Sequence, residues 1–160
     1  HMDHPGFEIT SNHDGNYIAQ AMGGIPTSSF EAGVPIQVIL PDGKRILGST
    51  MGMFGEENER QVLIKLDQPQ DLEPPLSAVF DLTDFELDGE HIRMRAVDDL
   101  AGCGSILSAL TRLSSGDAPP GDVYGVFTRA EEVGLVGARL LAEAGTQPPE
   151  TLVISAASSR

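Results

Sequence analysis

The sequence predicts an α/β fold in which a module of short strands is inserted beside a parallel sheet with flanking helices. Between residues 25 and 93, short apolar strands alternate with turns, as in a small β-barrel or sandwich. From residue 94 onward the pattern becomes helix, strand, helix, strand, which is typical of a parallel sheet covered by helices. We therefore assign residues 1–24 and 94–160 to the α/β part and residues 25–93 to the inserted module.

Composition and charge exclude several classes of function. The chain has 160 residues, 40% of them hydrophobic and 21% charged, which is typical of a globular domain with a real core. A net charge of −14, with no cluster of Lys and Arg, argues against binding to nucleic acid. No apolar run is long enough for a membrane helix, and no signal-peptide pattern is present. Cys103 is the only cysteine, which excludes an intrachain disulfide and agrees with a cytoplasmic location.

The inserted module and the segment before it contain clear hairpin signals. Asp-Gly pairs at Asp14-Gly15, Asp42-Gly43 and Asp88-Gly89 lie between apolar runs, and this dipeptide favours two-residue turns. Residues 60–66 alternate between apolar and polar side chains, which predicts a strand with one face exposed to water.

The second half predicts two helices, each followed by a strand. Apolar residues recur at helical spacing from Asp99, a candidate N-cap, to about Leu113, and again over residues 132–144. Strands are predicted at Val123–Phe127 and Leu152–Ser155. Because a parallel core rarely ends on an unaccompanied strand, we expect this chain to be a segment of a longer protein.

Adjacent carboxylates follow the first of these strands. Parallel sheets place ligands at the carboxyl ends of their strands, and Glu131-Glu132 lies at such an end. One acid could bind a metal ion while the other moves a proton from water. The alternative is structural, because Thr128-x-x-Glu131 also fits a helix capping box.

Two further polar groups have both a chemical and a structural interpretation. In Asp98-Asp99, one Asp could bridge two cations about 3.5–4 Å apart, or the pair could only cap a helix. In His1-x-Asp3, a carboxylate could orient a metal-binding imidazole. Alternatively, His1-Met2 is the remnant of an expression tag, and the residues that follow form a polar turn.

The remaining candidates have ordinary structural explanations. His13 and His91 lie in or beside hairpins and are interpreted as surface residues. Cys103 lies on the apolar face of a predicted helix and is interpreted as a core residue. Arg129 and Arg139 could hold a substrate carboxylate, but surface salt bridges are the simpler use.

Three stretches in this order resemble signatures of the dinuclear-zinc aminopeptidases. The first is His-Met-Asp-His-Pro-Gly-Phe at residues 1–7. The second is residues 95–102, which contain Asp-Asp, and the third is residues 127–138, which contain Glu-Glu. The branch that they resemble contains the tetrahedral, glutamyl and deblocking aminopeptidases. In that branch a small β-barrel is inserted between the first two signatures, which is where residues 25–93 fall.

The resemblance implies a role for each acidic or imidazole group. His1 would bind one metal ion, oriented by Asp3, while Asp98 would bridge both ions and Glu132 would bind the second. Glu131 would be the general base that takes a proton from water. The implied cofactors are two divalent metal ions, with zinc expected first and cobalt or manganese compatible with the same ligands. The implied substrates are peptides with a free α-amino group, and the implied assembly is a homo-oligomer in which the barrel contributes to assembly and substrate access.

The sequence lacks two ligands that the family pattern leads us to expect. The strand after the second helix should end in a carboxylate, but Ala157 occupies that position, and the final His ligand would lie beyond Arg160. Each ion would then keep about two protein ligands, whereas stable zinc sites need three or four. The chain by itself is therefore expected to be a poor catalyst. Two alternatives stay open: a non-catalytic relative that acts in assembly or peptide binding, and an unrelated α/β protein whose acidic pairs are helix caps.

Overall fold

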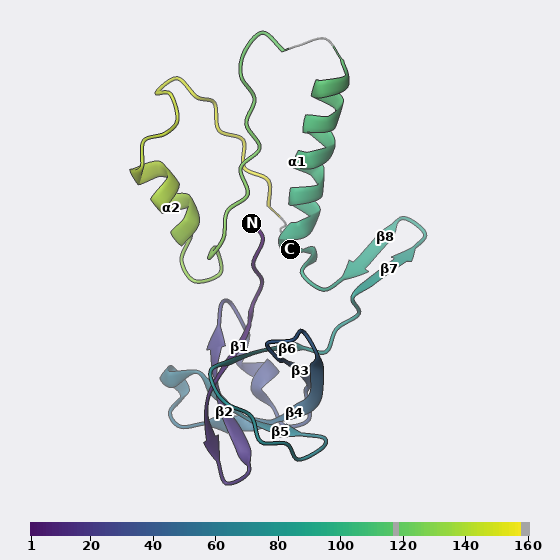
Figure 1. Ribbon diagram of the computed structural model, residues 1–160, viewed down its shortest axis with the longest axis vertical. Helices are drawn as coiled ribbons and strands as arrows, with labels where there is room; N and C mark the ends of the chain where they lie inside the picture. The colour runs from purple at the N-terminus through teal and green to yellow at the C-terminus, as the bar shows by residue number, and fades with distance from the viewer. Residues whose placement is uncertain (117–118, 158–160) are drawn as a thin grey trace. The chain divides into compact units, whose positions relative to one another are not determined.

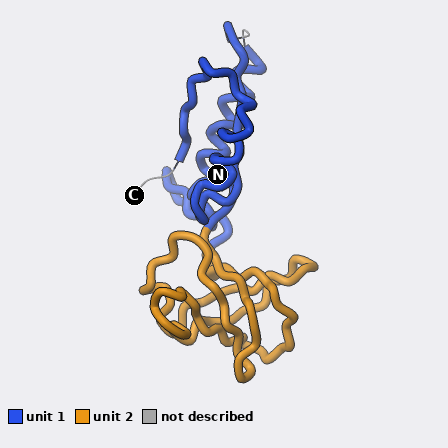
Figure 2. The backbone as a smooth tube through the Cα atoms, turned by 90° about the vertical axis from the view of Figure 1, so that its left-hand side faces the viewer, with its two compact units in different colours: residues 1–4, 83–160 blue, residues 5–82 orange. Residues whose placement is uncertain are grey.

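The computed structural model describes residues 1–116 and 119–157 and contains two compact units. Residues 5–82 form one unit, and residues 1–4 join the part of the chain after residue 82 to form the other (Figure 2). The first four residues therefore belong to the same unit as the Asp-Asp and Glu-Glu pairs.

Residues 5–82 contain a closed antiparallel barrel with strand order β1-β2-β5-β4-β3-β6 (Figure 1). Two short 3-10 helices, η1 (Thr27–Phe30) and η2 (Glu57–Glu59), lie between strands. The strands are β1 (Gly6–His13), β2 (Asn16–Met22), β3 (Pro35–Ile39), β4 (Arg45–Phe54), β5 (Gln61–Leu66) and β6 (Leu76–Phe80). Closure leaves no edge strand between them, which removes a common route to aggregation.

The barrel core follows the two-residue period of its strands. In β5, Val62, Ile64 and Leu66 are buried, and the residues between them are not, as the alternation predicted. Ile36 and Val38 of β3 are fully buried in the same core. A Leu or Ile side chain buried in this way stabilises the fold by about 1.5–3 kcal/mol.

The hairpins form where the Asp-Gly pairs predicted them. His13 pairs with Asn16, so that Asp14-Gly15 is a two-residue turn, and both residues have positive φ, at 50° and 80°. These angles are those of the turn type that suits the twist of a hairpin. Asp42-Gly43 joins β3 to β4, and Asp88-Gly89 lies where β7 turns into β8.

The barrel begins and ends earlier than the expected range of 25–93. β1 is needed for closure because it pairs with both β2 and β6, so that residues 6–22 belong to the barrel. β7 (Phe85–Asp88) and β8 (His91–Met94) pair only with each other and lie in the other unit. The barrel therefore contains part of the segment that the sequence assigned to the α/β part.

The other unit contains α1 (Val97–Ser115) and α2 (Val136–Glu143). The predicted parallel sheet is not confirmed, because residues 123–127 and 152–155 form no strand in the structure. Their side chains are largely exposed, with Tyr124 at 68% and Ile154 at 84%. A strand needs a hydrogen-bonded neighbour, and these segments have none within the described residues.

The second helix begins four residues later than expected. Gly134 and Leu135 have positive φ, which interrupts the helical backbone before Val136. The N-cap of α2 is Leu135, which makes no capping hydrogen bond, and the first turn carries no acid. The capping-box interpretation of Thr128 and Glu131 is therefore wrong.

No helix within the described residues is long and apolar enough to cross a membrane.

The substitution Ile64→Ala tests the packing of the barrel. It should lower the free energy of unfolding by about 2–5 kcal/mol, because it leaves a cavity at a fully buried position. Urea denaturation followed by circular dichroism would measure this change. Leu47→Ala is the matched control in the same barrel, because Leu47 is 50% exposed and its loss should change stability by less than about 0.5 kcal/mol. Equal losses in the two variants would contradict the assigned core.

Candidate metal centre

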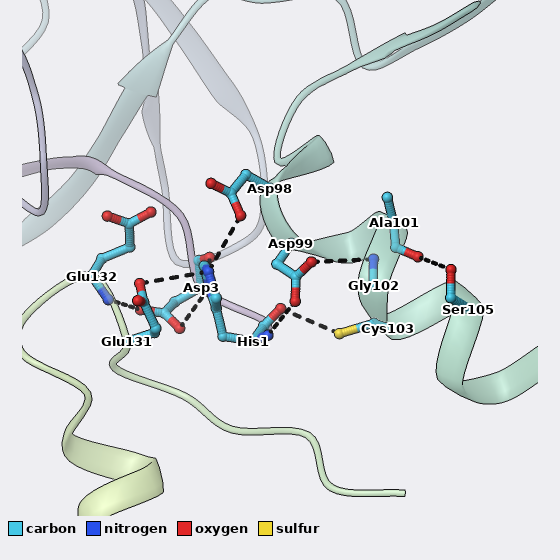
Figure 3. A network of polar contacts seen from close by, with 10 residues as sticks. All are labelled: His1, Asp3, Asp98, Asp99, Ala101, Gly102, Cys103, Ser105, Glu131 and Glu132. Carbon is cyan, nitrogen blue, oxygen red and sulfur yellow. Dashed lines mark hydrogen bonds and ion pairs between the residues drawn. The ribbon is translucent and has the colours of Figure 1, made fainter. Parts of the chain in front are cut away.

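Three separated segments bring imidazole and carboxylate groups together within one unit (Figure 3). They are the first three residues, the beginning of α1 and the loop that precedes α2. The main-chain nitrogen of Met2 donates a hydrogen bond to the carbonyl oxygen of Thr128 at 2.9 Å, which joins the first segment to the third.

His1 lies at the centre of this cluster, and its ring is nearly buried, with 8% of the side chain exposed. Nδ1 lies 3.0 Å from the carbonyl oxygen of Asp3. A carbonyl oxygen can only accept, so Nδ1 carries the proton, and in the neutral ring Nε2 keeps its lone pair. Nε2 lies 3.5 Å from Asp98 Oδ1 and 3.5 Å from Glu131 Oε2. A lone pair that faces two carboxylate oxygens needs a proton or a metal cation between them.

Asp3 connects the imidazole to the Glu-Glu pair. Its carbonyl oxygen holds the ring of His1, and its Oδ2 accepts a hydrogen bond from the main-chain nitrogen of Glu132 at 3.2 Å. Oδ1 is buried and has no hydrogen-bond partner among the described residues, although it lies 3.6 Å from His1 Nδ1. Asp3 thus contacts the ring mainly through its main chain, while its carboxylate fixes the backbone of the neighbouring acid.

Asp98 and Asp99 contact different parts of His1, the ring and the main-chain nitrogen respectively. The peptide bond between them is cis, and both residues depart from helical angles. Asp98 is half exposed and faces Nε2 of the ring. Asp99 is buried and its Oδ1 accepts a hydrogen bond from the main-chain nitrogen of Gly102 at 3.2 Å, as an N-cap side chain does. The capping interpretation therefore describes one contact of Asp99 and none that the structure shows for Asp98.

The loop before α2 presents Glu131 and Glu132 to His1. One ligand atom from each of these three residues can lie within 4.8 Å of the others, which is a spacing suited to a metal ion. The loop closes on itself through hydrogen bonds from the main-chain nitrogens of Leu135 and Gly137 to the carbonyl oxygens of Glu131 and Arg129. Gly137 is required for this approach, because a Cβ atom there would lie 2.4 Å from the Arg129 oxygen.

Two contacts of the cluster were not expected from the sequence. Asp99 Oδ2 accepts a hydrogen bond from the main-chain nitrogen of His1 at 2.8 Å. Cys103, which was interpreted as a core residue, is indeed buried, and its Sγ also donates to the carbonyl oxygen of His1 at 3.2 Å. No local pattern in the sequence indicated either contact.

The other candidate residues lie at the surface. His13 and His91 are exposed, as predicted, and Arg139 forms an exposed ion pair with Glu143 one helical turn away. Arg129 is exposed in the loop. Ala157 is exposed in an irregular segment and offers no carboxylate.

Comparisons with known proteins agree with the resemblance. Residues 73–159 match the family model of the M42 glutamyl aminopeptidases, which is more than half of the chain. The chain belongs to the M42 family. A comparison with curated protein sequences gave no significant match.

Solved structures match both units of the chain. An aminopeptidase from the archaeon Desulfurococcus kamchatkensis is 26% identical with a TM-score of 0.69, and the match covers 91% of this chain and 43% of that one. A TET aminopeptidase from a marine sediment archaeon of the Thaumarchaeota is 22% identical with a TM-score of 0.74, covering 90% and 46%. The TET1 peptidase of Pyrococcus horikoshii is 24% identical with a TM-score of 0.67, covering 89% and 47%. The chain thus spans less than half the length of the structures that it matches.

The residues of the cluster fit the divalent metal ion that the M42 family implies. Imidazole nitrogen and carboxylate oxygen are ligands that zinc, cobalt and manganese accept. A cation would also relieve the repulsion between the Nε2 lone pair of His1 and the oxygens of Asp98 and Glu131. Among the described residues, His1, Asp98 and Glu132 supply this donor set, and Glu131 lies beside them.

The substitution Gly137→Ala tests how the Glu-Glu loop is held. The added methyl group would clash with the Arg129 carbonyl oxygen and destabilise the closed loop by about 1–3 kcal/mol. Limited trypsin digestion should then cleave after Arg129 several times faster than in the unsubstituted protein. Gly121→Ala is the control, because a Cβ atom at Gly121 meets nothing within 4 Å. Equal cleavage rates in all three proteins would show that Gly137 does not close the loop.

Proposed function

We propose that this chain supplies the metal-binding and proton-transferring residues of a metal-dependent aminopeptidase. The observation that carries the proposal is the position of Nε2 of His1, which lies 3.5 Å from one oxygen of Asp98 and one of Glu131. His1, Asp98 and Glu132 would hold the metal ions, of which we propose two, with zinc first and cobalt or manganese as substitutes. Membership of the M42 family and the fold shared with aminopeptidases support this.

The residues of the chain have distinct tasks in this proposal. The hydrogen bond to the Asp3 carbonyl keeps the lone pair of His1 directed at the metal site. The bond from Glu132 to the Asp3 carboxylate keeps the second ligand beside it. Glu131 would take a proton from the attacking water and later transfer it to the departing amine. When bound, the metal ions would activate that water and stabilise charge that develops on the carbonyl oxygen of the first peptide bond.

We further propose a homo-oligomeric assembly in which the barrel takes part. Related proteins that share the fold form a dodecamer and either a tetrahedron or a large octahedral shell. Peptides with a free α-amino group are the proposed substrates, and neither nucleic acid nor a membrane is a proposed partner. The cytoplasmic location that the single cysteine suggested stays a prediction.

A second candidate function is supported by one observation. Ala157 stands where the family pattern expects a carboxylate ligand, and it is exposed in the structure. With this ligand missing, the chain would be a non-catalytic relative that serves assembly or peptide binding. The two candidates differ in one measurable property, which is metal-dependent turnover of an aminoacyl p-nitroanilide.

Paired substitutions of the adjacent glutamates test the assigned roles. Glu131→Gln should lower turnover by about 10²- to 10⁴-fold and leave bound zinc unchanged, because it removes a base and not a ligand. Glu132→Gln should reduce the zinc that remains bound after dialysis. Turnover and metal content, measured on the same samples, give both results.

Glu90→Gln is the control for non-specific attraction of cations, because Glu90 is an exposed acid in the β7–β8 turn. It should change neither quantity. Loss of zinc from the Glu131→Gln variant would mean that the two glutamates have the opposite roles. Stoichiometric zinc without any turnover in the unsubstituted protein would favour the non-catalytic candidate.

A further inference from the structure

Asp99 is a buried carboxylate that does not face the other acids of the cluster. Only 1% of its side chain is exposed, and its two oxygens accept hydrogen bonds from different segments. Oδ1 accepts from the main-chain nitrogen of Gly102 at 3.2 Å, and Oδ2 accepts from the main-chain nitrogen of His1 at 2.8 Å (Figure 3). Asp99 therefore joins the beginning of α1 to the backbone of the residue whose ring lies at the metal centre.

Gly102 leaves the space that the Asp99 carboxylate occupies. A Cβ atom at Gly102 would lie 2.3 Å from Asp99 Oδ1 and 2.7 Å from Oδ2, which is too close for any side chain. Gly104 lies on the same helix, and a Cβ atom there would meet nothing within 4 Å. Helix α1 thus contains one glycine that is sterically required, Gly102, and one that is not, Gly104.

Cys103 contacts His1 at its carbonyl group, whereas Asp99 contacts it at its nitrogen. Its Sγ donates a hydrogen bond to the carbonyl oxygen of His1 at 3.2 Å. The main chain of His1 is thereby held at its nitrogen by Asp99 and at its carbonyl oxygen by Cys103.

We infer that Asp99, Gly102 and Cys103 form a backbone clamp that positions the imidazole of His1. A side chain is oriented by its backbone, and among the described residues the hydrogen bond of the His1 ring is the one to the Asp3 carbonyl oxygen. With the main chain fixed at both ends, Nδ1 can reach that carbonyl and Nε2 faces the carboxylates. These are positioning residues, and the inference rests on the proposed function only where the ring is taken as a metal ligand.

The metal-free protein tests the clamp directly through the imidazole nitrogens of His1. In ¹⁵N-labelled protein, with His1→Ala used for assignment, the Nδ1 proton of the His1 ring should exchange slowly with solvent, because the Asp3 carbonyl oxygen accepts it. Asp99→Asn and Gly102→Ala should speed this exchange, and Gly104→Ala should not. An unchanged His1 ring in both clamp variants would overturn the inference. If circular dichroism shows that the Asp99→Asn variant does not fold, the result for Gly102→Ala alone tests the inference.

The cysteine provides a conservative rescue. Cys103→Ser keeps a donor for the His1 carbonyl oxygen and should keep the slow exchange of the Nδ1 proton, whereas Cys103→Ala should speed that exchange in part. A general packing role would make the two variants alike, and that result would remove Cys103 from the clamp.

A cobalt titration separates this inference from the proposed function. In a protein that binds cobalt, Asp99→Asn should weaken binding by about 10- to 100-fold, as is usual for groups that orient a ligand. The same substitution in a His1→Ala background should have no further effect, because Asp99 acts through His1. Equal losses in both backgrounds would overturn the inference. Absence of cobalt binding in the unsubstituted protein would refute the proposed function. The nitrogen resonances of the metal-free protein would still test whether the clamp positions the His1 ring.

Discussion

The hydrogen bond between His1 Nδ1 and the Asp3 carbonyl oxygen determines what the neighbouring carboxylates can do. It places the ring proton on the side away from the acids and leaves the Nε2 lone pair facing Asp98 and Glu131. Without a proton or a metal cation on Nε2, the lone pair and the carboxylate oxygens repel one another. With a divalent cation, His1 and Asp98 supply imidazole nitrogen and carboxylate oxygen as ligands, and Glu131 lies beside them as the proposed base. The rest of the unit can be understood as the support for this one orientation.

That support comes mostly from the backbone. The first three residues are tied to the loop before α2 by Met2 and Asp3, and to α1 by the contacts of Asp99 and Cys103 with His1. Glycines allow two of these approaches, since a side chain at position 102 or 137 would clash with the groups that it lies against. The functional side chains therefore come from loop residues and a helix end, where backbone angles are free to depart from the helical values. This agrees with the general tendency of binding residues to lie on loops held by a scaffold.

Local patterns in the sequence were enough to predict the hairpins and the strand alternation of the barrel. Asp14-Gly15 forms the expected turn, and β5 buries the expected side chains, because both features depend on neighbouring residues alone. The limits of the barrel depend on which strands close it. The closing pair is β1 and β6, which are far apart in the sequence, so local patterns could not predict this pairing. The segments 123–127 and 152–155 have strand-like composition, but composition cannot supply the neighbour that a strand requires.

The roles of the candidate site residues stay predictions, and the structure shows only that these residues lie together. The sequence identified His1, Asp3, Asp98, Glu131 and Glu132, and the structure brings these side chains together in one cluster. The contacts of Asp99 and Cys103 with His1 span about a hundred residues of sequence and have no local signature. The capping interpretation of the Glu-Glu pair failed for a local reason, since the left-handed residues Gly134 and Leu135 delay the helix.

X-ray absorption spectroscopy of the zinc-loaded protein tests the central claim most directly. The account predicts that zinc has oxygen and nitrogen neighbours with the multiple scattering of one imidazole, and that this imidazole signal disappears in His1→Ala. The chain contains 4 histidines, so this variant identifies which of them binds. Zinc bound without an imidazole, or an imidazole signal that survives the loss of His1, would contradict the account.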